Sequence, residues 1–209
     1  MDSRFNSYLS IRMIADRFTA GLMLVLLCPL FAIVSLLILC RMGRPLLFRQ
    51  KRIGQFGATF EIIKFRTMVE GAETIGAGYM APELDLIPPL GRFLRASSLD
   101  ELPQLINILR GEMSFVGPRP ALPQQYARYS PKQARRVLVP QGITGLAQVT
   151  YRNEATWSQR IEKDLEYIES IGFVTDMKLL LSTVNKVLRS EGVVSHQTAA
   201  DVDDLGQNK

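Results

Sequence analysis

Two adjacent carboxylates and a later arginine enclosed by prolines are the residues best suited to chemistry in this chain. Asp100 and Glu101 stand in the string Leu-Asp-Glu-Leu-Pro-Gln, and Arg119 lies between Pro118 and Pro120. Proline fixes its own φ angle and restricts the residue before it, so the backbone at Arg119 is held on both sides. A fixed guanidinium favours bidentate recognition of phosphate or carboxylate. The pattern indicates a site that holds a phosphate group together with a metal ion.

The carboxylate pair has two interpretations. Ser98 and Glu101 have the spacing of a capping box, in which the serine caps a helix and the glutamate reaches back. The same place also suits catalysis, because amides at a helix start attract anions. An ionised Asp100 is a competent nucleophile towards phosphorus and gives an acyl-phosphate intermediate. Its neighbour Glu101 could hold a divalent cation, a hard ion that prefers oxygen ligands.

Other cations near these strings could add to a phosphate site. Arg95 precedes the carboxylate pair, and Lys64 and Arg66 end an apolar stretch that resembles a strand. For each of them, a solvated surface charge is the alternative. The loop from Pro140 to Gly145 carries two glycines whose amides could cradle a phosphate, although short glycine loops are common.

Length and composition suit one domain with a membrane element. The chain has 209 residues, a net charge of +5 and a pI near 9.4, so its partners are expected to be anionic: phosphorylated ligands, lipid or nucleic acid. A nucleic-acid partner is disfavoured because the cations are spread along the chain without a recognised binding motif. Cys28 and Cys40 are too few for a disulfide framework or a zinc site, and the lone His196 lies in a polar tail.

Residues 18–40 contain no charged side chain and are long enough for a membrane helix. Pro29 interrupts this run and predicts a bend. Arginines flank the run on both sides, and cytoplasmic flanks are the ones that carry such charges. A helix that enters the membrane, breaks at Cys28-Pro29 and returns keeps both flanks on one side. A single span and a buried soluble helix are the alternatives.

The remaining pattern predicts an α+β fold that is mostly helical, with one small β-hairpin. The two strands are expected at residues 46–50 and 59–66, with glycines in the turn between them. A last amphipathic helix from about Thr175 to Arg189 could pack on the core or lie at a membrane interface. We expect a membrane element at 1–43, a catalytic domain at 44–194 and a polar, disordered tail at 195–209.

Several strings, taken together and in order, resemble a known family. They are Phe-Arg-Gln at 48–50, Lys-Phe-Arg-Thr-Met at 64–68, the stretch 95–104, the stretch 107–111, Met-Ser-Phe-Val-Gly-Pro-Arg-Pro at 113–120, the stretch 140–149 and Arg-Asn at 152–153. The chain is similar to the monotopic bacterial phosphoglycosyl transferases, also called bacterial sugar transferases. The resemblance covers about residues 10–190 and implies a re-entrant membrane helix, with the helical catalytic domain at the membrane face.

The resemblance also implies an activity. Such enzymes move a sugar 1-phosphate from a UDP-sugar to a membrane polyprenyl phosphate and release UMP, at the cytoplasmic face of the bacterial inner membrane. Asp100 corresponds to the nucleophile, and Glu101, with Asp100 beside it, to the Mg²⁺ site. The residues expected to bind substrate are Lys64, Arg66, Arg95, Arg119, Gln148, Arg152 and Asp176.

Two positions depart from the family pattern. Cys28 stands where the family has a serine before the proline, and Leu146 stands where many members have tryptophan. The hydroxyl that could satisfy freed backbone carbonyls is absent at Cys28, and the indole is absent at Leu146. A different class of function, an anchored scaffold with a basic surface, explains the charge and the apolar run. It does not explain Arg119 or the carboxylate pair.

Overall fold

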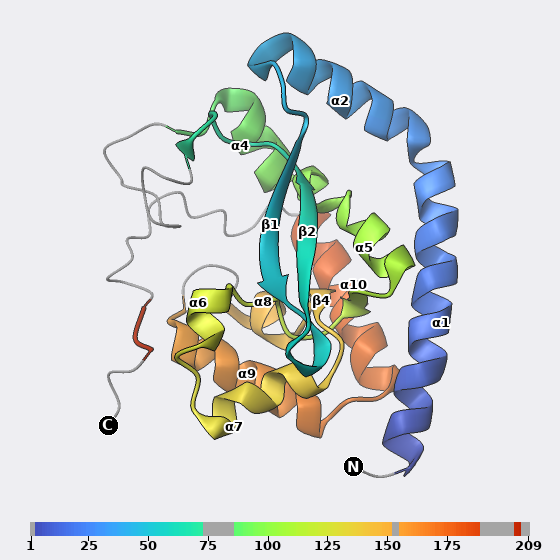
Figure 1. The fold of residues 1–209 in the computed structure, drawn as a ribbon. Coiled ribbons are helices and arrows are strands. Elements are labelled where there is room, and N and C mark those ends of the chain that lie inside the picture. The colour runs from blue at the N-terminus through green and yellow to red at the C-terminus, as the bar shows by residue number, and fades with distance from the viewer. Residues whose placement is uncertain (1–2, 73–85, 152–154, 189–202, 206–209) are drawn as a thin grey trace.

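The computed structural model describes residues 3–72, 86–151, 155–188 and 203–205. It is mostly helical, as the sequence predicts, with a long bent helix pair along one side (Figure 1). The pair consists of α1 (Ser3–Leu26) and α2 (Cys28–Met42). Arg152, which is expected to bind substrate, His196 and most of the predicted tail lie outside the described residues.

The helix pair bends where the sequence predicts a break. The two axes meet at 63°, and Pro29 stands in the first turn of α2, where its missing N–H costs no helical hydrogen bond. Within the described ranges, no single helix combines the length and apolar composition needed to cross a membrane, but the bent pair meets that test jointly. The exposed apolar side chains of α1 recur at helical spacing and form one outer stripe: Ile11, Ile14, Phe18, Leu22 and Val25.

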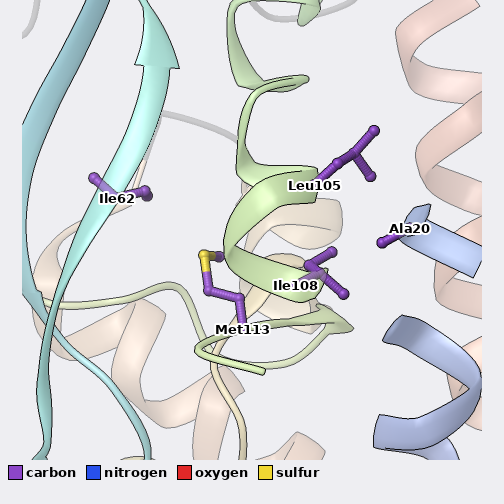
Figure 2. Packing of buried hydrophobic residues seen from close by; sticks show 5 residues of the cluster. All are labelled: Ala20, Ile62, Leu105, Ile108 and Met113. Atoms are coloured by element: carbon purple, nitrogen blue, oxygen red, sulfur yellow. The ribbon is translucent and has the colours of Figure 1, made fainter. Parts of the chain in front are cut away.

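The inner faces of the same helices pack on the domain. In Figure 2, α5 (Gln104–Arg110) lies between α1 and the hairpin, and its Leu105 and Ile108 face Ala20 of α1. Ile62 and Met113 complete this buried cluster. Burying one such aliphatic side chain contributes about 1.5–3 kcal/mol. The cluster therefore fixes α1 against the elements that carry the candidate site.

A second cluster attaches α2. Val34 and Ile38 of α2 pack with Phe65 and with Leu94 of α4 (Pro89–Ala96). Since Phe65 ends a strand and Leu94 lies in the helix before the carboxylate pair, α2 is joined to the region that surrounds Asp100.

The predicted β-hairpin is confirmed. Strands β1 (Leu47–Ile53) and β2 (Thr59–Phe65) are antiparallel, with Leu47 opposite Phe65 and Ile53 opposite Thr59. A 3-10 turn, η1 (Gln55–Gly57), joins them, and Gly57 adopts a φ of +81°, which glycine accepts without strain. Lys64 is thereby placed at the end of β2.

Residues 140–145, which the sequence predicts to form a phosphate-cradling loop, instead include a short β-strand. Residues Gly142–Thr144 form β4, which pairs in parallel with β3 (Ser114–Val116). A Cβ at Gly142 would lie 2.2 Å from the amide nitrogen of Gly117, and one at Gly145 would lie 2.3 Å from the carbonyl oxygen of Gly117. These glycines permit two backbone segments to approach closely, which explains them without a phosphate.

The C-terminal half adds short helices and two longer ones. The short elements are α6 (Pro123–Tyr126), α7 (Pro131–Ala134), η3 (Arg135–Leu138) and α8 (Leu146–Tyr151). The longer ones are α9 (Trp157–Glu169), which Thr156 caps, and α10 (Phe173–Leu188). Of the two alternatives for the last helix, packing on the core is observed, because Leu179 is buried with Val116 and Tyr167. Its other face exposes Phe173, Val174, Leu181 and Val184.

Three residues of the tail are described. Leu205 is buried, and Asp203 accepts a hydrogen bond of 2.7 Å from Arg128. Asp204 accepts a further hydrogen bond from the amide of Ser158 at the start of α9. These three residues pack against the domain, whereas the sequence analysis expects a disordered tail.

Candidate active site

The carboxylate pair lies in a single 3-10 turn, η2 (Leu99–Glu101), between α4 and α5. The capping-box prediction is wrong, since no helix begins at Ser98 and α5 begins only at Gln104. Ser98 adopts the left-handed conformation, with a φ of +56°, and its side chain makes no capping hydrogen bond. A capping residue needs extended backbone, so this geometry removes the cap. Both carboxylates are consequently free for other partners.

One carboxylate oxygen of Glu101 accepts hydrogen bonds from two cationic side chains. Its Oε1 accepts a hydrogen bond of 2.6 Å from Nζ of Lys64 and another of 2.6 Å from the guanidinium of Arg119. Lys64 comes from the end of β2, and Arg119 from the segment after β3. Residues far apart in the sequence therefore meet around the pair, as the sequence analysis expects.

Burial and neighbouring charges together shift the pKa values of the two carboxylates in opposite directions. Burial raises the pKa of Asp100 to about 6; Lys64 opposes this shift and the charge of Glu101 adds to it. Burial alone would raise the pKa of Glu101 too, but Arg119 and Lys64 outweigh it and hold that pKa well below its usual range. At neutral pH Glu101 is a fixed anion that neutralises cations, and Asp100 is the more basic, less engaged carboxylate. That is the better nucleophile of the two.

The backbone around Arg119 is fixed by hydrogen bonds to three successive carbonyl groups. The amide of Gly142 donates to the carbonyl of Pro118 at 2.9 Å, and Arg136 donates to the carbonyl of Arg119 at 2.8 Å. Arg52 donates to the carbonyl of Pro120 at 3.1 Å. Because the flanking prolines have no N–H, carbonyls are the hydrogen-bonding groups that they offer. The predicted rigidity of Arg119 has these contacts as its physical basis.

Arg136 is itself anchored by a buried partner. It is 2% exposed and forms an ion pair with Asp164 of α9, and it also donates to the hydroxyl of Tyr129 at 2.6 Å. Sequence analysis missed both Arg136 and Asp164. Arg136 was missed because it stands in a basic stretch, and such stretches usually form solvated surface. The signal available was Val137 and Val139, apolar residues that place this stretch partly inside.

Arg95 lies beside the pair as predicted. Its Nε donates to the hydroxyl of Thr67 at 2.8 Å, and burial lowers its pKa while the charges of Asp100 and Glu101 oppose that shift. Asn107 is another residue that the sequence analysis missed. Its side chain bonds to the amide of Ile63 and the carbonyl of Glu61 and ties α5 to β2.

Two residues expected to bind substrate have structural partners within the chain. Arg66 donates to the carbonyls of Met42, Gly43 and Arg44, and so satisfies the C-terminal end of α2. Asp176 lies in a buried network at the start of α10. It accepts hydrogen bonds from Arg12 at 2.8 Å, from Tyr167 at 2.7 Å and from Tyr8 at 2.6 Å.

The structure provides only two carboxylates for the predicted Mg²⁺ site. Across the described ranges, no cluster of three or more His, Cys, Asp or Glu residues could hold an ion. Mg²⁺ nevertheless often uses one or two carboxylates and takes its other ligands from water and substrate phosphates. Asp100 and Glu101 provide such a pair, so the donor set fits Mg²⁺ that arrives with a phosphorylated ligand.

Sequence comparison relates the chain to known proteins. The family model described as bacterial sugar transferase matches residues 7–190. The chain belongs to the bacterial sugar transferase family.

Individual relatives of this sugar transferase cover most of its length. It is 44% identical over 161 residues to EpsL of Bacillus subtilis, named as an uncharacterized sugar transferase, over 76% of this chain and 79% of the relative. It is 39% identical to the UDP-glucose:undecaprenyl-phosphate glucose-1-phosphate transferase of Caulobacter vibrioides, over 85% of this chain and 70% of that one. It is 35% identical to the undecaprenyl-phosphate galactose phosphotransferase of Salmonella typhimurium, over 73% of this chain and 35% of that larger protein.

Proposed function

We propose that this sugar transferase moves a sugar 1-phosphate from a UDP-sugar to a membrane polyprenyl phosphate, releases UMP and so initiates glycoconjugate synthesis. The name of the Caulobacter relative supports the donor and acceptor classes, and the name of the Salmonella relative supports the acceptor class. The observation that carries the proposal is the turn Leu99–Glu101, where a buried carboxylate of raised pKa adjoins a carboxylate bound to two cations.

The reaction is proposed in two displacement steps at phosphorus. A carboxylate oxygen of Asp100 attacks the β-phosphorus of the donor, and the bond to the bridging oxygen breaks. UMP leaves with that oxygen, and the phosphosugar remains as an acyl phosphate on Asp100. An oxygen of the polyprenyl phosphate then attacks the same phosphorus. This second step restores the Asp100 carboxylate and gives a polyprenyl diphosphate sugar.

The cations around the turn lower the cost of bringing these charges together. The donor diphosphate, the acceptor phosphate and Asp100 are all anionic, so each step meets electrostatic repulsion. Arg119, Lys64 and Arg95 supply fixed positive charge where negative charge develops. Glu101 holds two of these cations in place before substrate arrives.

Glu101, with Asp100 beside it, would hold a Mg²⁺ ion that arrives with the donor, and the ion would supply positive charge at the phosphate oxygens. Chelation of divalent cations with EDTA is expected to abolish sugar-phosphate transfer, and excess Mg²⁺ to restore it. Transfer that continues undiminished in EDTA would remove the metal from the proposal.

The membrane arrangement is proposed from the bent helix pair. The exposed stripe of α1 and the exposed side chains Leu36 and Leu37 of α2 are apolar surface that lipid could cover. The exposed face of α10 offers more such surface. Basic flanks on both sides of the run favour a re-entrant path, with both ends in the cytoplasm and the carboxylate pair at the headgroup level.

Substitution of the nucleophile tests the proposal. Asp100→Asn retains the size of the side chain but removes its nucleophilic charge, so transfer from UDP-sugar to polyprenyl phosphate is expected to stop. Asp203→Asn is a matched control, because Asp203 pairs with Arg128 near the C-terminus. Both variants should show the wild-type circular dichroism spectrum. Near-normal turnover by Asp100→Asn would overturn the nucleophile assignment.

A further inference from the structure

Residues 203–205, in the sequence Asp-Asp-Leu, form a short segment that docks onto the domain. Leu205 is 2% exposed, whereas Asp203 and Asp204 are only partly buried. Burying a leucine side chain is favourable, and the surface that covers it comes from other parts of the fold, because the two preceding residues are aspartates. One apolar side chain therefore anchors the segment.

Arg128, which follows α6, binds both ends of this segment. One terminal nitrogen of its guanidinium donates to the carboxylate of Asp203 at 2.7 Å, and the other donates to the backbone carbonyl of Leu205. The amide of Leu205 in turn donates to the carboxylate of Asp203 at 3.2 Å. These bonds form a closed turn, so the site selects an acidic residue two positions before the leucine.

Asp204 binds a helix end that the helix's own cap leaves open. Thr156 accepts a hydrogen bond from the amide of Gln159, whereas the amide of Ser158 donates to Asp204 at 2.9 Å. First-turn amides have no partner inside their helix, and the helix dipole favours an anion there. Burial alone would raise the pKa of Asp204, but the hydrogen bonds from Ser158 and Thr156 outweigh it and lower that pKa. The segment thus supplies a second cap for α9.

These contacts are few enough to be reversible. The side chain of Arg128 is 44% exposed where it pairs with Asp203, and solvent and salt weaken an ion pair of this kind. Of the three residues in the segment, only Leu205 is buried. A segment with little buried surface separates from a domain at a lower free-energy cost than global unfolding.

Helix α9 connects the segment to the candidate site. Further along this helix, Asp164 forms the buried ion pair with Arg136. Arg136 donates to the backbone carbonyl of Arg119 at 2.8 Å. A contact that holds the first turn of α9 therefore limits the motion of the helix that anchors the Arg119 backbone.

We propose that Arg128, the first turn of α9 and the surface that buries Leu205 form a docking site for an Asp-Asp-Leu peptide. Residues 203–205 of this chain occupy it as a releasable brace. When the brace is docked, α9 is held at its start and Arg119 keeps its position. The docking site goes beyond the proposed function, and only the effect of the brace on turnover rests on that function.

A peptide added to the full-length protein tests the docking site. Leu205→Ser removes the apolar anchor and vacates the site, so a peptide with the sequence of residues 200–209 is expected to bind to this variant. Trp157 is the single tryptophan of the chain and precedes Ser158, so its fluorescence in detergent reports binding. The same peptide with the Leu205→Ser change should have a Kd at least about tenfold higher. Equal Kd values for the two peptides would overturn the docking site.

Hydrogen exchange tests whether the segment braces α9. In Leu205→Ser, the amides of α9 are expected to exchange faster than in the wild-type protein, and the 200–209 peptide is expected to restore their protection. Leu181→Ser is the matched control, because Leu181 is 65% exposed on α10 and should leave α9 unchanged. Unchanged exchange of α9 in Leu205→Ser would show that the segment does not brace this helix.

Turnover tests the connection to Arg119. Leu205→Ser is expected to lower kcat with little change in the KM for the UDP-sugar, and the peptide should restore kcat. Leu205→Met stays apolar, and Asp203→Asn keeps an acceptor for Arg128, so both should retain wild-type kcat. An unchanged or raised kcat in Leu205→Ser would overturn the connection. If the wild-type protein transfers no sugar phosphate, the proposed function fails, while peptide binding and exchange still decide the docking site and the brace.

Discussion

The guanidinium of Arg136 donates a hydrogen bond of 2.8 Å to the backbone carbonyl of Arg119. One arginine thus fixes the backbone of another, and the second arginine reaches Glu101 at 2.6 Å. The prolines on either side of Arg119 narrow its backbone choices, and Arg136 selects one of them. The cation beside the carboxylate pair is therefore positioned before any ligand binds.

Arg136→Ala is expected to destabilise the fold and to reduce activity. It leaves Asp164 buried without its partner, which costs about 3–5 kcal/mol of unfolding free energy. The exposed neighbour gives a matched control, since Arg135→Ala should change stability by less than about 0.5 kcal/mol. Denaturant unfolding of both variants is the measurement. Similar stability of the two variants would show that the buried ion pair contributes little.

Replacement of Arg119 tests its role in catalysis. Arg119→Ala removes a cation that we propose stabilises developing charge, and the loss of one such group is expected to lower kcat by about 10²–10³-fold. Arg119→Lys keeps the charge but not the planar fork, so it should recover only part of the rate. Steady-state UMP release measures both variants. Full activity of Arg119→Ala would show that the reaction does not need this residue.

Substitution of Asp176 can distinguish a structural role of this residue from a role in substrate binding. The sequence analysis expects it to bind substrate, whereas the structure buries it with Arg12, Tyr8 and Tyr167. Asp176→Ala is thus expected to lower the unfolding free energy by about 3–5 kcal/mol, because Arg12 loses its counter-ion. The KM for the UDP-sugar should be unchanged at a temperature where the variant is folded. A raised KM with wild-type stability would instead support the substrate-binding interpretation.

The membrane path can be tested by cysteine labelling. The chain has two cysteines, Cys28 and Cys40, and both are replaced by serine to give a background without thiols. Single cysteines are then placed at two exposed positions, Ser7 near the start of α1 and Ala58 after the bent pair. A re-entrant path predicts that an impermeant reagent modifies both from the cytoplasmic side. Modification from opposite sides would establish a true span.

Local signals in the sequence predicted local structure well. Pro29 marked the bend, and the glycines around 54–57 marked the hairpin turn. Each of these outcomes depends on the backbone preference of one or two residues.

Signals that depend on distant partners were misread. Ser98 has the spacing of a cap, but its left-handed backbone is stabilised by the surrounding fold and not by its own type. The strand at Gly142 needs β3 beside it, and the burial of Arg136 needs Asp164 from α9. Lys64 and Arg119 were expected near the carboxylate pair as phosphate-binding cations, but their ion pairs with Glu101 were not predicted, because they depend on three-dimensional geometry.

The central claim is that Asp100 carries the phosphosugar between donor and acceptor. Incubation of the protein with a UDP-sugar labelled in the sugar, without polyprenyl phosphate, tests it most directly. The predicted result is the release of one equivalent of UMP and a labelled peptide that contains Asp100, found after rapid quenching and mass spectrometry. Addition of polyprenyl phosphate should then remove the label. If single-turnover conditions give polyprenyl product while Asp100 is never labelled, transfer is direct and the account is contradicted.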